Sequence, residues 1–225
     1  MTNADKALEF IRNDSVIGLG SGHAAERFIQ ALADRVRAGL RIRGVPTSRA
    51  SAAIAALAGI PLISLEEGMP LDVTVDGADE VDPHLNLIKG YGRALVREKI
   101  VAAASRQLII LVGPEHISEK IVDVLGQRGK LPVEVVPFSL PLCRKRIADL
   151  GYSSEPLREG EHLFATDNGN HIIECHVKAI PDTAALECQL RAIPGVVGTG
   201  LFLGMADLVL IQRDSDLEMR TKSKT

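Results

Sequence analysis

The sequence is poor in cysteine and shows no pairing pattern for it. Its 225 residues include three cysteines, Cys143, Cys175 and Cys188, with no CxxC pair and no histidines at the spacing of metal ligands. An odd number of cysteines without such a pattern argues against a disulfide framework and against a zinc site. We therefore expect reduced, partly buried thiols and no bound metal.

The sequence also lacks a long hydrophobic run. Its most apolar stretch, residues 50–63, is interrupted by Gly59 and Pro61, whereas a membrane-spanning helix needs roughly 18 or more unbroken apolar residues. Residues 1–14 alternate charged and apolar side chains, which is not the pattern of a secretory signal. We expect a cytoplasmic protein with no membrane partner.

A basic excess is missing as well. Lysine and arginine together number 26 against 29 aspartate and glutamate residues, and the net charge is -3. Binding to a nucleic-acid backbone depends on a positive field, so nucleic acid is not an expected partner, although a local basic patch stays compatible with this charge. The chain does have 46% hydrophobic residues, enough to bury the core of one domain or of one domain that carries a smaller second one.

Helix and strand signals alternate through the first half of the chain. The predicted helices are residues 4–12, residues 24–38, a helix ending at residue 57, and residues 93–105. The predicted strands are residues 15–20, 40–45, 61–64, 71–75 and 107–112. The last of these is nearly all apolar, which suits a parallel strand covered on both faces. The alternation favours an open parallel α/β sheet.

The second half has strands that pair locally. Beyond residues 126–130 the pattern predicts a strand at 131–136, a helix at 140–150, two strands at 164–167 and 171–177 around the Asn168-Gly169 turn, and a helix at 183–193. We interpret this set as a small α+β domain formed by residues 128–198. A glycine-rich return at 195–204 leads to a final strand at 208–212, and the charged tail after residue 213 is expected to be mobile. Residues 1–127 and 199–225 then form the sheet domain.

A glycine-rich loop at residues 18–24 lies between a predicted strand and a predicted helix. Glycines let the backbone approach an anion, and a helix N-terminus offers unpaired N–H donors, so the loop is a candidate phosphate site. The alternative is a simple tight turn between strand and helix. A dinucleotide site also needs an acidic residue at the end of the second strand, but residues 45–48 offer only hydroxyls, which disfavours an NAD enzyme.

Two carboxylates follow the strand predicted at residues 71–75. Asp76 ends this strand and Asp79 comes three residues later, at the edge of the sheet where open α/β proteins bind ligands. Such a pair can move protons among sugar hydroxyls. The alternative for the neighbouring acids, Glu80 and Asp82, is that they cap a turn or face solvent.

A second glycine-rich loop begins at Lys89 and leads into the helix that carries Glu98. The helical neighbours of Glu98 are apolar, which predicts that its carboxylate lies against an apolar face. Partial burial would raise its pKa, as a base that works near neutral pH requires. The alternative is an ordinary exposed glutamate on a helix.

Taken together, the motifs resemble type A ribose-5-phosphate isomerase over nearly the full length. They are GLGSG at 18–22, PTS at 46–48, DGADEVD at 76–82, LNLIKGYG at 85–92, REKI at 97–100, LPVEVVP at 131–137, TDNGN at 166–170 and IPGVVGTGLF at 193–202. The resemblance implies a Rossmann-like open parallel sheet with an inserted small α+β (ferredoxin-like) lid domain, and an assembly of two or four copies.

The resemblance also implies an activity. It is the interconversion of ribose 5-phosphate and ribulose 5-phosphate through an enediol, in the pentose phosphate pathway, without a metal or cofactor. Glu98 would be the base, and Asp76, Asp79 and Lys89 would assist ring opening and proton movement, with Lys89 also stabilising the enediolate. The implied substrate contacts are Ser21, Gly22, His23, Ala24, Asp76, Gly77, Ala78, Asp79, Lys89, Gly90, Tyr91, Gly92, Arg93 and Lys120.

Two loops depart from the family's pattern. Where members commonly have GTGST and KGGGAA, this chain has GSGHA at residues 20–24 and KGYGRA at 89–94. We hypothesise that His23 and Arg93 replace the lost hydroxyls as phosphate contacts, because charge-assisted hydrogen bonds are strong. Two other functions stay open: a sugar-phosphate sensor without turnover, and an isomerase for a different sugar phosphate, whose pocket Tyr91 would reshape.

Overall fold

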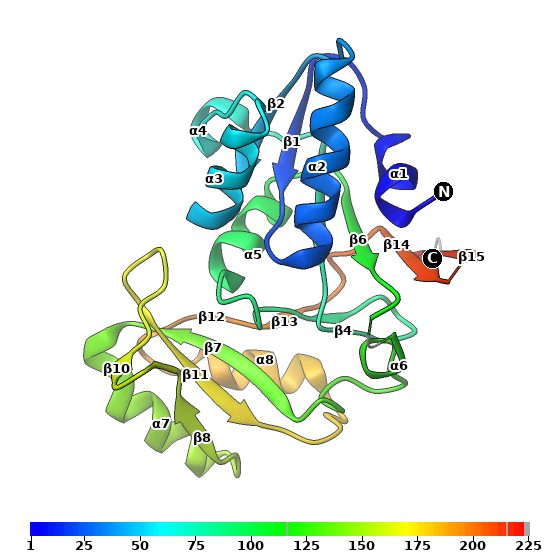
Figure 1. Cartoon of the computed structure of the whole chain (residues 1–225). Coiled ribbons are helices and arrows are strands. Elements are labelled where there is room, and N and C mark those ends of the chain that lie inside the picture. Colours follow the sequence, from blue (N-terminus) through cyan, green and yellow to red (C-terminus); the bar gives the residue numbers. More distant parts are fainter. Residues whose placement is uncertain (116, 215, 223–225) are drawn as a thin grey trace. The chain divides into compact units, whose positions relative to one another are not determined.

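The chain folds into two compact units. A computed structural model describes residues 1–115, 117–214 and 216–222 (Figure 1). Unit 1 comprises Met1–Ala78, Arg97–Ile117 and Gly204–Thr225, and unit 2 comprises Asp79–Val96 and Ser118–Leu203. The smaller domain predicted at residues 128–198 lies within unit 2, which also takes in residues 79–96, 118–127 and 199–203.

Unit 1 is built on a six-stranded sheet in the order β15-β14-β6-β3-β1-β2. Its strands are β1 Ser15–Leu19, β2 Ile42–Pro46, β3 Val73–Gly77, β6 Leu108–Val112, β14 Leu208–Arg213 and β15 Asp216–Thr221. All neighbours pair in parallel except β14 and β15, which are antiparallel. The predicted open parallel α/β sheet is confirmed.

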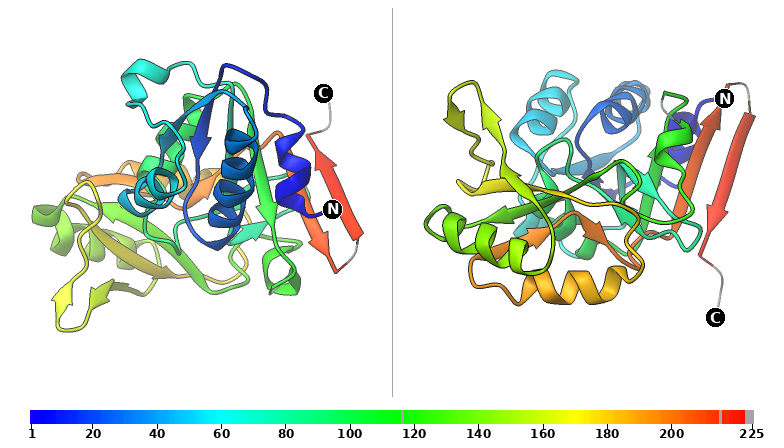
Figure 2. Two further views of the ribbon diagram at one scale, coloured as in Figure 1. Left: turned by 45° about the horizontal axis from the view of Figure 1, so that its top comes forward. Right: turned by 90° about the horizontal axis from the view of Figure 1, so that it is seen from below.

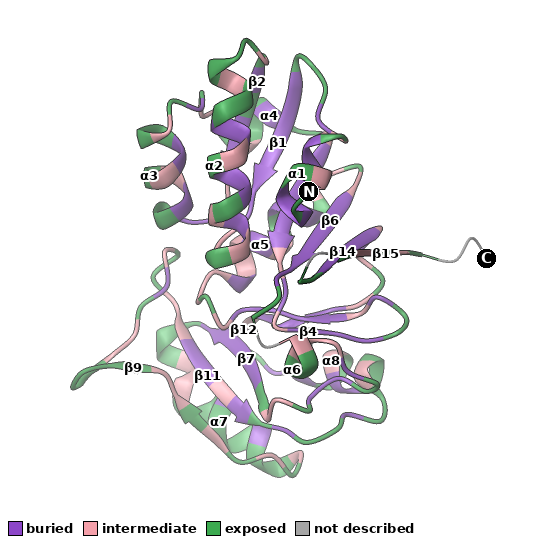
Figure 3. Cartoon of the chain, turned by 45° about the vertical axis from the view of Figure 1, so that its right-hand side comes forward, coloured by how far each residue is buried: buried purple, intermediate pink, exposed green. Residues whose placement is uncertain are grey.

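Helices cover both faces of this sheet. Unit 1 contains α1 Asn3–Leu8, α2 His23–Arg37, α3 Arg49–Leu57 and α4 Leu65–Gly68, and α5 Leu95–Ala103 crosses the unit boundary. The alternation along β1 shows the two layers, because Ile17 packs into the cluster that contains Phe28 of α2, whereas Val16 packs with Val101 of α5. Every residue of β1 and β6 is therefore buried (Figure 3).

Three predictions for unit 1 differ from the structure. The first helix ends at Leu8 rather than at residue 12. The strand predicted at residues 61–64 is reduced to one bridge between Leu62 and Gly44. The prediction of a mobile tail was wrong for residues 216–221, because β15 pairs with β14 along the edge of the sheet (Figure 2); residues 215 and 223–225 of that tail lie outside the described residues. Three of the six β15 residues are charged and none is buried, which is why the segment was interpreted as a charged tail.

Unit 2 contains a four-stranded antiparallel sheet in the order β12-β7-β11-β8. In chain order its elements are β7 Lys130–Val135, α7 Leu140–Asp149, β8 Ser154–Pro156, β11 His171–His176, α8 Thr183–Arg191 and β12 Val196–Thr199, with the short η1 Pro137–Ser139 before α7. This βαββαβ order is the ferredoxin-like arrangement, as predicted. Cys143 of α7 and Leu186 of α8 share one core with Val133 of β7.

The strand predicted at residues 164–167 was wrong. The hairpin lies just before it, between β9 Arg158–Glu159 and β10 His162–Leu163. The Asn168-Gly169 turn exists, with φ of +77° at Gly169. It is closed by backbone hydrogen bonds from Thr166 N–H to the Asn170 carbonyl and from Gly169 N–H to the Thr166 carbonyl, at 2.8 Å each, and a buried side chain holds it as well. Glu134 of β7 is 1% exposed and accepts hydrogen bonds from Thr166 Oγ1, Asn168 Nδ2 and Asn170 Nδ2 at 3.0, 3.1 and 2.9 Å.

A second, three-stranded sheet of unit 2 joins three distant parts of the chain. Its strands, β4 Glu80–Val81, β5 Leu87–Ile88 and β13 Leu201–Phe202, are two residues long each and pair in the order β13-β5-β4. Unit 2 also contains α6 Ile117–Lys120, whose first residue belongs to unit 1. Among the described residues, no helix combines the length and the hydrophobicity that crossing a membrane requires.

Candidate active site

The loop after β1 leads directly into α2. Gly22 precedes the helix with φ of +85°, a backbone conformation that glycine adopts without strain. No described side chain caps the first turn of α2, so its N–H groups suit an anion. The His23 side chain is 97% exposed, and its Nδ1 lies 3.6 Å from Glu26 Oε2.

Hydroxyl groups gather beside this loop. Ser21 Oγ lies 2.8 Å from Thr47 Oγ1 and 2.7 Å from Ser48 Oγ. Thr47 is in turn tied to β1 through a hydrogen bond to the Leu19 carbonyl at 3.0 Å, and Ser48 caps α3 by accepting from the Ser51 N–H at 3.0 Å. The PTS segment therefore supports the glycine-rich loop through hydroxyls.

Asp76 lies at the end of β3, next to the same loop. Its carboxylate is 1% exposed, and Oδ1 accepts hydrogen bonds from the N–H groups of Ser21 and Gly77 at 3.1 and 2.7 Å. A Cβ at Gly20 would lie 2.3 Å from this oxygen, so only glycine fits there. Parallel pairing of β1 with β3 brings the two loops together, because both strands end at the same edge of the sheet.

Glu98 lies on α5 and is 3% exposed. Its neighbours one turn further on, Val101 and Ala102, are buried as well. The carboxylate therefore lies on the apolar side of the helix, as predicted, and the alternative of an exposed surface glutamate is excluded.

In unit 2, Asp79 is a carboxylate among cations. Its Oδ2 accepts a hydrogen bond from the Tyr91 N–H at 2.9 Å. Burial raises the pKa of Asp79, and this effect exceeds the lowering by the Tyr91 hydrogen bond and by the positive charges of Lys89, Arg128 and Lys120. The last of these, Lys120, ends α6.

Lys89 comes directly after β5. It is 3% exposed, and its Nζ lies 5.5 Å from the centre of the Phe202 ring, within reach of a cation–π interaction. The Lys89 N–H donates to the Gly200 carbonyl at 2.9 Å. A Cβ at Gly200 would lie 2.4 Å from the Lys89 carbonyl oxygen. The glycine of the VGTG segment therefore lets this segment approach the backbone of Lys89.

Glu80 has a structural role that the sequence did not reveal. It is fully buried, and its carboxylate accepts hydrogen bonds from the N–H groups of Gly126 and Arg128 at 2.5 and 2.7 Å. Burial raises the pKa of Glu80, and these N–H groups oppose the rise. Asp82 caps a turn, since its Oδ1 accepts from the N–H groups of His84 and Asn86 at 2.8 Å each. Glu80 and Asp82 thus both accept hydrogen bonds from backbone N–H groups and hold nearby loops in place.

The two unusual side chains of the Lys89 loop have partners within unit 2. The Tyr91 hydroxyl donates to the Lys130 carbonyl at 3.0 Å, and the Arg128 guanidinium lies 5.2 Å from the Tyr91 ring centre. The Arg93 guanidinium lies 4.8 Å from the Phe164 ring centre and 3.4 Å from Glu159 Oε1. Both side chains thus tie the loop to segments of the four-stranded sheet and its hairpin.

Comparison with known proteins assigns the chain to a family. The family model for ribose 5-phosphate isomerase A (phosphoriboisomerase A) matches residues 43–216. The chain belongs to the ribose 5-phosphate isomerase A family. It is 49% identical over 215 residues to ribose-5-phosphate isomerase A of Rhodopseudomonas palustris strain HaA2, covering 92% of this chain and 90% of that protein.

Solved structures of ribose 5-phosphate isomerases share the whole fold. The isomerase A of Methanocaldococcus jannaschii has a TM-score of 0.91 at 34% identity, covering 98% of this chain and 97% of its own. A D-ribose-5-phosphate isomerase in complex with phospho-erythronic acid has a TM-score of 0.91 at 37% identity, covering 97% of this chain and 96% of its own. The mixed α/β fold is therefore that of the isomerase A family.

Proposed function

We propose that this chain interconverts D-ribose 5-phosphate and D-ribulose 5-phosphate. The observation that carries the proposal is the buried Glu98 carboxylate on the apolar side of α5, in a chain of the isomerase A family. A carboxylate can serve as a general base, and burial there shields it from bulk water. The phospho-erythronic acid bound by a related isomerase is a phosphorylated sugar acid, which supports a sugar phosphate as the substrate.

The proposed chemistry is proton transfer between neighbouring carbons. Glu98 removes the C2 proton of the open-chain aldose, the electron pair forms the enediolate, and the same carboxyl returns the proton to C1. Negative charge develops on the substrate oxygen, and the Lys89 ammonium stabilises it. Asp76 and Asp79 open the sugar ring and move protons among the oxygens.

The proposed phosphate contacts combine N–H donors with side chains. The N–H groups at the start of α2 are oriented as an anion site requires. Ser21, Gly22, His23 and Ala24 are the proposed contacts at this helix. Substrate contacts from unit 2 are proposed at Asp79, Lys89, Gly90, Tyr91, Gly92, Arg93 and Lys120. Further contacts from unit 1 are proposed at Asp76 and Gly77, which end β3, and at Ala78.

The deciding experiment compares the purified protein with Glu98→Gln. Ribose 5-phosphate is supplied in the presence of a chelator, and ribulose 5-phosphate is measured. Loss of a general base costs about 10²–10⁴-fold in kcat, so we expect product from the wild type and at least a hundredfold less from Glu98→Gln. Glu66→Gln, which removes an exposed carboxylate from α4, is the matched control and should keep full activity.

A second candidate function is isomerisation of a different sugar phosphate. Tyr91 favours it, because a ring occupies a loop that is glycine in the family's common pattern and lines two cavities of unit 2. A panel of aldose phosphates separates the candidates through kcat/KM. A sensor would bind a sugar phosphate without forming product from any member of the panel, and that outcome would contradict both enzyme functions.

We also propose that the protein assembles into a dimer or tetramer. Support comes from apolar side chains exposed next to β7 and on α7. Phe138 is 96% exposed, and Val136 and Leu142 are exposed as well. Light scattering after size-exclusion chromatography tests the assembly, and a monomer at micromolar concentration would contradict it.

A further inference from the structure

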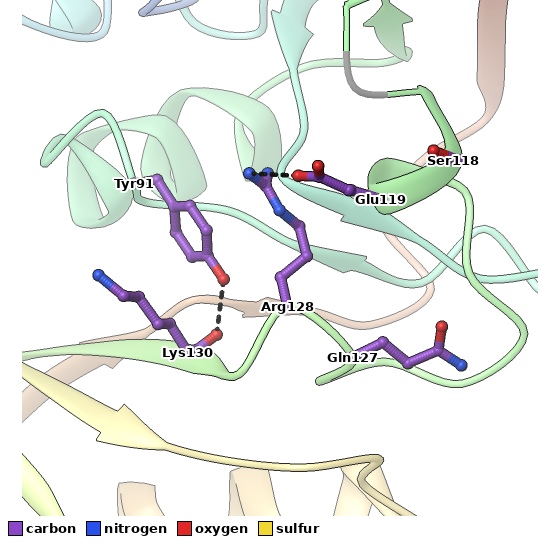
Figure 4. A pocket seen from close by; sticks show the side chains of 6 residues that line it. All are labelled: Tyr91, Ser118, Glu119, Gln127, Arg128 and Lys130. Carbon is purple, nitrogen blue, oxygen red and sulfur yellow. Dashed lines mark hydrogen bonds and ion pairs between the residues drawn. The ribbon is translucent and has the colours of Figure 1, made fainter.

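Tyr91 borders two cavities of unit 2. The larger, about 560 Å³, is lined by Tyr91, Ser118, Glu119, Gln127, Arg128 and Lys130 (Figure 4). The smaller, about 250 Å³, is also lined by Tyr91 and Lys130, together with residues of the four-stranded sheet. The two shared side chains form a common wall, so the position of the Tyr91 ring shapes both spaces.

Tyr91 is held at three points. Its backbone N–H donates to Asp79 Oδ2 at 2.9 Å, its hydroxyl donates to the Lys130 carbonyl at 3.0 Å, and its ring faces the Arg128 guanidinium at 5.2 Å. A cation over an aromatic face contributes roughly 0.5–2 kcal/mol, depending on exposure. The side-chain contacts therefore restrict the position of Tyr91, whose backbone N–H donates to the Asp79 carboxylate.

Arg128 is itself held by acids and by backbone. Its guanidinium lies 3.4 Å from Glu119 Oε2 and donates to the Asp79 carbonyl at 3.3 Å. Its backbone N–H donates to buried Glu80 at 2.7 Å. Figure 4 shows the Arg128 side chain reaching between Tyr91 and Glu119. Arg128 is thus held both at its backbone and at the guanidinium that faces the Tyr91 ring.

We propose that Tyr91 and Arg128 form a clamp that holds the Tyr91 N–H on the Asp79 carboxylate. Within the clamp both are positioning residues, because their side-chain contacts bear on the reaction through Asp79. The inference rests on the proposed function, in which Asp79 moves protons. The clamp gives a role to the bulky side chain in this glycine-rich loop. The Tyr91 side chain is anchored to residues outside the loop, and this anchoring restricts the position of the loop backbone.

The clamp affects a measurable property, the pKa of the Asp79 carboxyl group. The groups that bear on this carboxylate are the cations Lys89, Lys120 and Arg128 and the Tyr91 N–H, all of which lower its pKa, while burial raises it. Glu80 is next in the chain, and Glu119 pairs with Arg128. If the clamp loosens, the Tyr91 N–H contributes less, the pKa of Asp79 rises further, and the ionised form is lost at higher pH.

The test uses variants that leave the charge around Asp79 unchanged. Tyr91→Ala removes the ring, and Arg128→Lys keeps the cation but removes the planar group. In each, we expect the acid limb of kcat/KM to move to higher pH by about half a unit or more, since part of one hydrogen bond to a charged group is lost. Because both act through one contact, the shift in the double variant should be smaller than the sum.

Arg144→Lys on α7 is the matched control, since it makes the same change at an exposed position. Its acid limb should coincide with that of the wild type. Acid limbs of Tyr91→Ala and Arg128→Lys that coincide with the wild type, or that shift additively in the double variant, would overturn the clamp. If Tyr91→Ala does not fold, Tyr91→Phe replaces it, because that variant keeps the ring and loses only the bond to Lys130.

A second measurement separates this inference from the proposed function. The Asp79 carboxyl carbon is titrated by NMR in the wild type and in Arg128→Lys. A higher midpoint in the variant supports the clamp even if the wild type does not act on ribose 5-phosphate, which would refute the proposed function alone. Equal midpoints in an active enzyme refute the clamp and leave the proposed function in place.

Discussion

The N–H of Ser21 donates to Oδ1 of Asp76 at 3.1 Å, so the glycine-rich loop after β1 is tied to the end of β3. This bond orients a buried carboxylate and a phosphate-binding candidate with one contact. It depends on the bare backbone at Gly20, since a Cβ there would lie 2.3 Å from the same oxygen. Gly20 therefore leaves room for the Asp76 carboxylate, in addition to letting the loop backbone approach the proposed phosphate.

Gly20→Ala should damage both stability and catalysis. The added methyl displaces the Asp76 carboxylate, and overpacking of this kind costs about 1–3 kcal/mol of unfolding free energy. A displaced catalytic group can cost about a hundredfold in rate, so we expect kcat to fall by one to two orders of magnitude. Urea denaturation and steady-state kinetics measure the two effects.

Gly39→Ala is the control for the stability part. Gly39 has φ of +104° and no atom within 4 Å of an added Cβ, so alanine there is strained without a clash. It should lower stability by about 1 kcal/mol and leave kcat unchanged. A Gly20→Ala enzyme with the wild-type kcat would contradict the argument.

Arg93→Ala tests the hypothesis that Arg93 contacts phosphate. Losing one charge-assisted hydrogen bond costs about 1.5–3 kcal/mol, so KM for ribose 5-phosphate should rise about tenfold or more while kcat changes little. Arg158→Ala removes an exposed arginine from the neighbouring hairpin and should leave KM unchanged. An unchanged KM in Arg93→Ala would mean that the guanidinium serves only Phe164 and Glu159.

The parallel sheet could be predicted because a strand buried on both faces appears in the sequence as an unbroken apolar run. β6 is buried at every position, and its unbroken apolar run predicted this. β15 alternates Asp216, Glu218 and Arg220 with Leu217 and Met219, but none of its six residues is buried. Its strand conformation therefore depends on pairing with β14, and its charge was interpreted as that of a tail. β4, β5 and β13 have two residues each, which is too short for any periodicity.

The site could be predicted only in part, for a similar reason. Asp76 lies at the end of a recognisable strand, and the apolar spacing around Glu98 predicted its burial. The role of Glu80 depends on N–H groups at residues 126 and 128, and the role of Arg128 depends on the Tyr91 ring. Contacts between loops so distant in the chain follow from the tertiary fold, which no local pattern encodes.

Glu80→Ala should destabilise the protein strongly. The substitution leaves the N–H groups of Gly126 and Arg128 without their acceptor, and each hydrogen bond to a charged group contributes about 1.5–3 kcal/mol. We expect a loss of about 2–5 kcal/mol in unfolding free energy, measured by urea denaturation. Glu155→Ala on β8, an exposed glutamate of the same unit, should change it by less than about 0.5 kcal/mol.

Asp79→Asn should separate stability from activity. The pKa of Asp79 is raised in the folded protein, mainly by burial, so folding favours the neutral carboxyl. Its contribution to stability is therefore fully present below the unfolded pKa, near 3.8, and is lost as pH rises through the folded pKa. Asparagine is neutral at every pH and its carbonyl can still accept the Tyr91 N–H, so the variant should have a higher Tm than the wild type at pH 8.

The pH dependence provides the check on this sign. The Tm difference between Asp79→Asn and the wild type should shrink as pH falls toward 4, because a growing fraction of the Asp79 carboxyl is then protonated. Activity at pH 8 should fall about a hundredfold or more, since the amide cannot take up a proton. Asp149→Asn, at an exposed position on α7, should change neither quantity appreciably. A lower Tm for Asp79→Asn at pH 8 would show instead that the ionised carboxylate stabilises the fold by neutralising Lys89, Lys120 and Arg128.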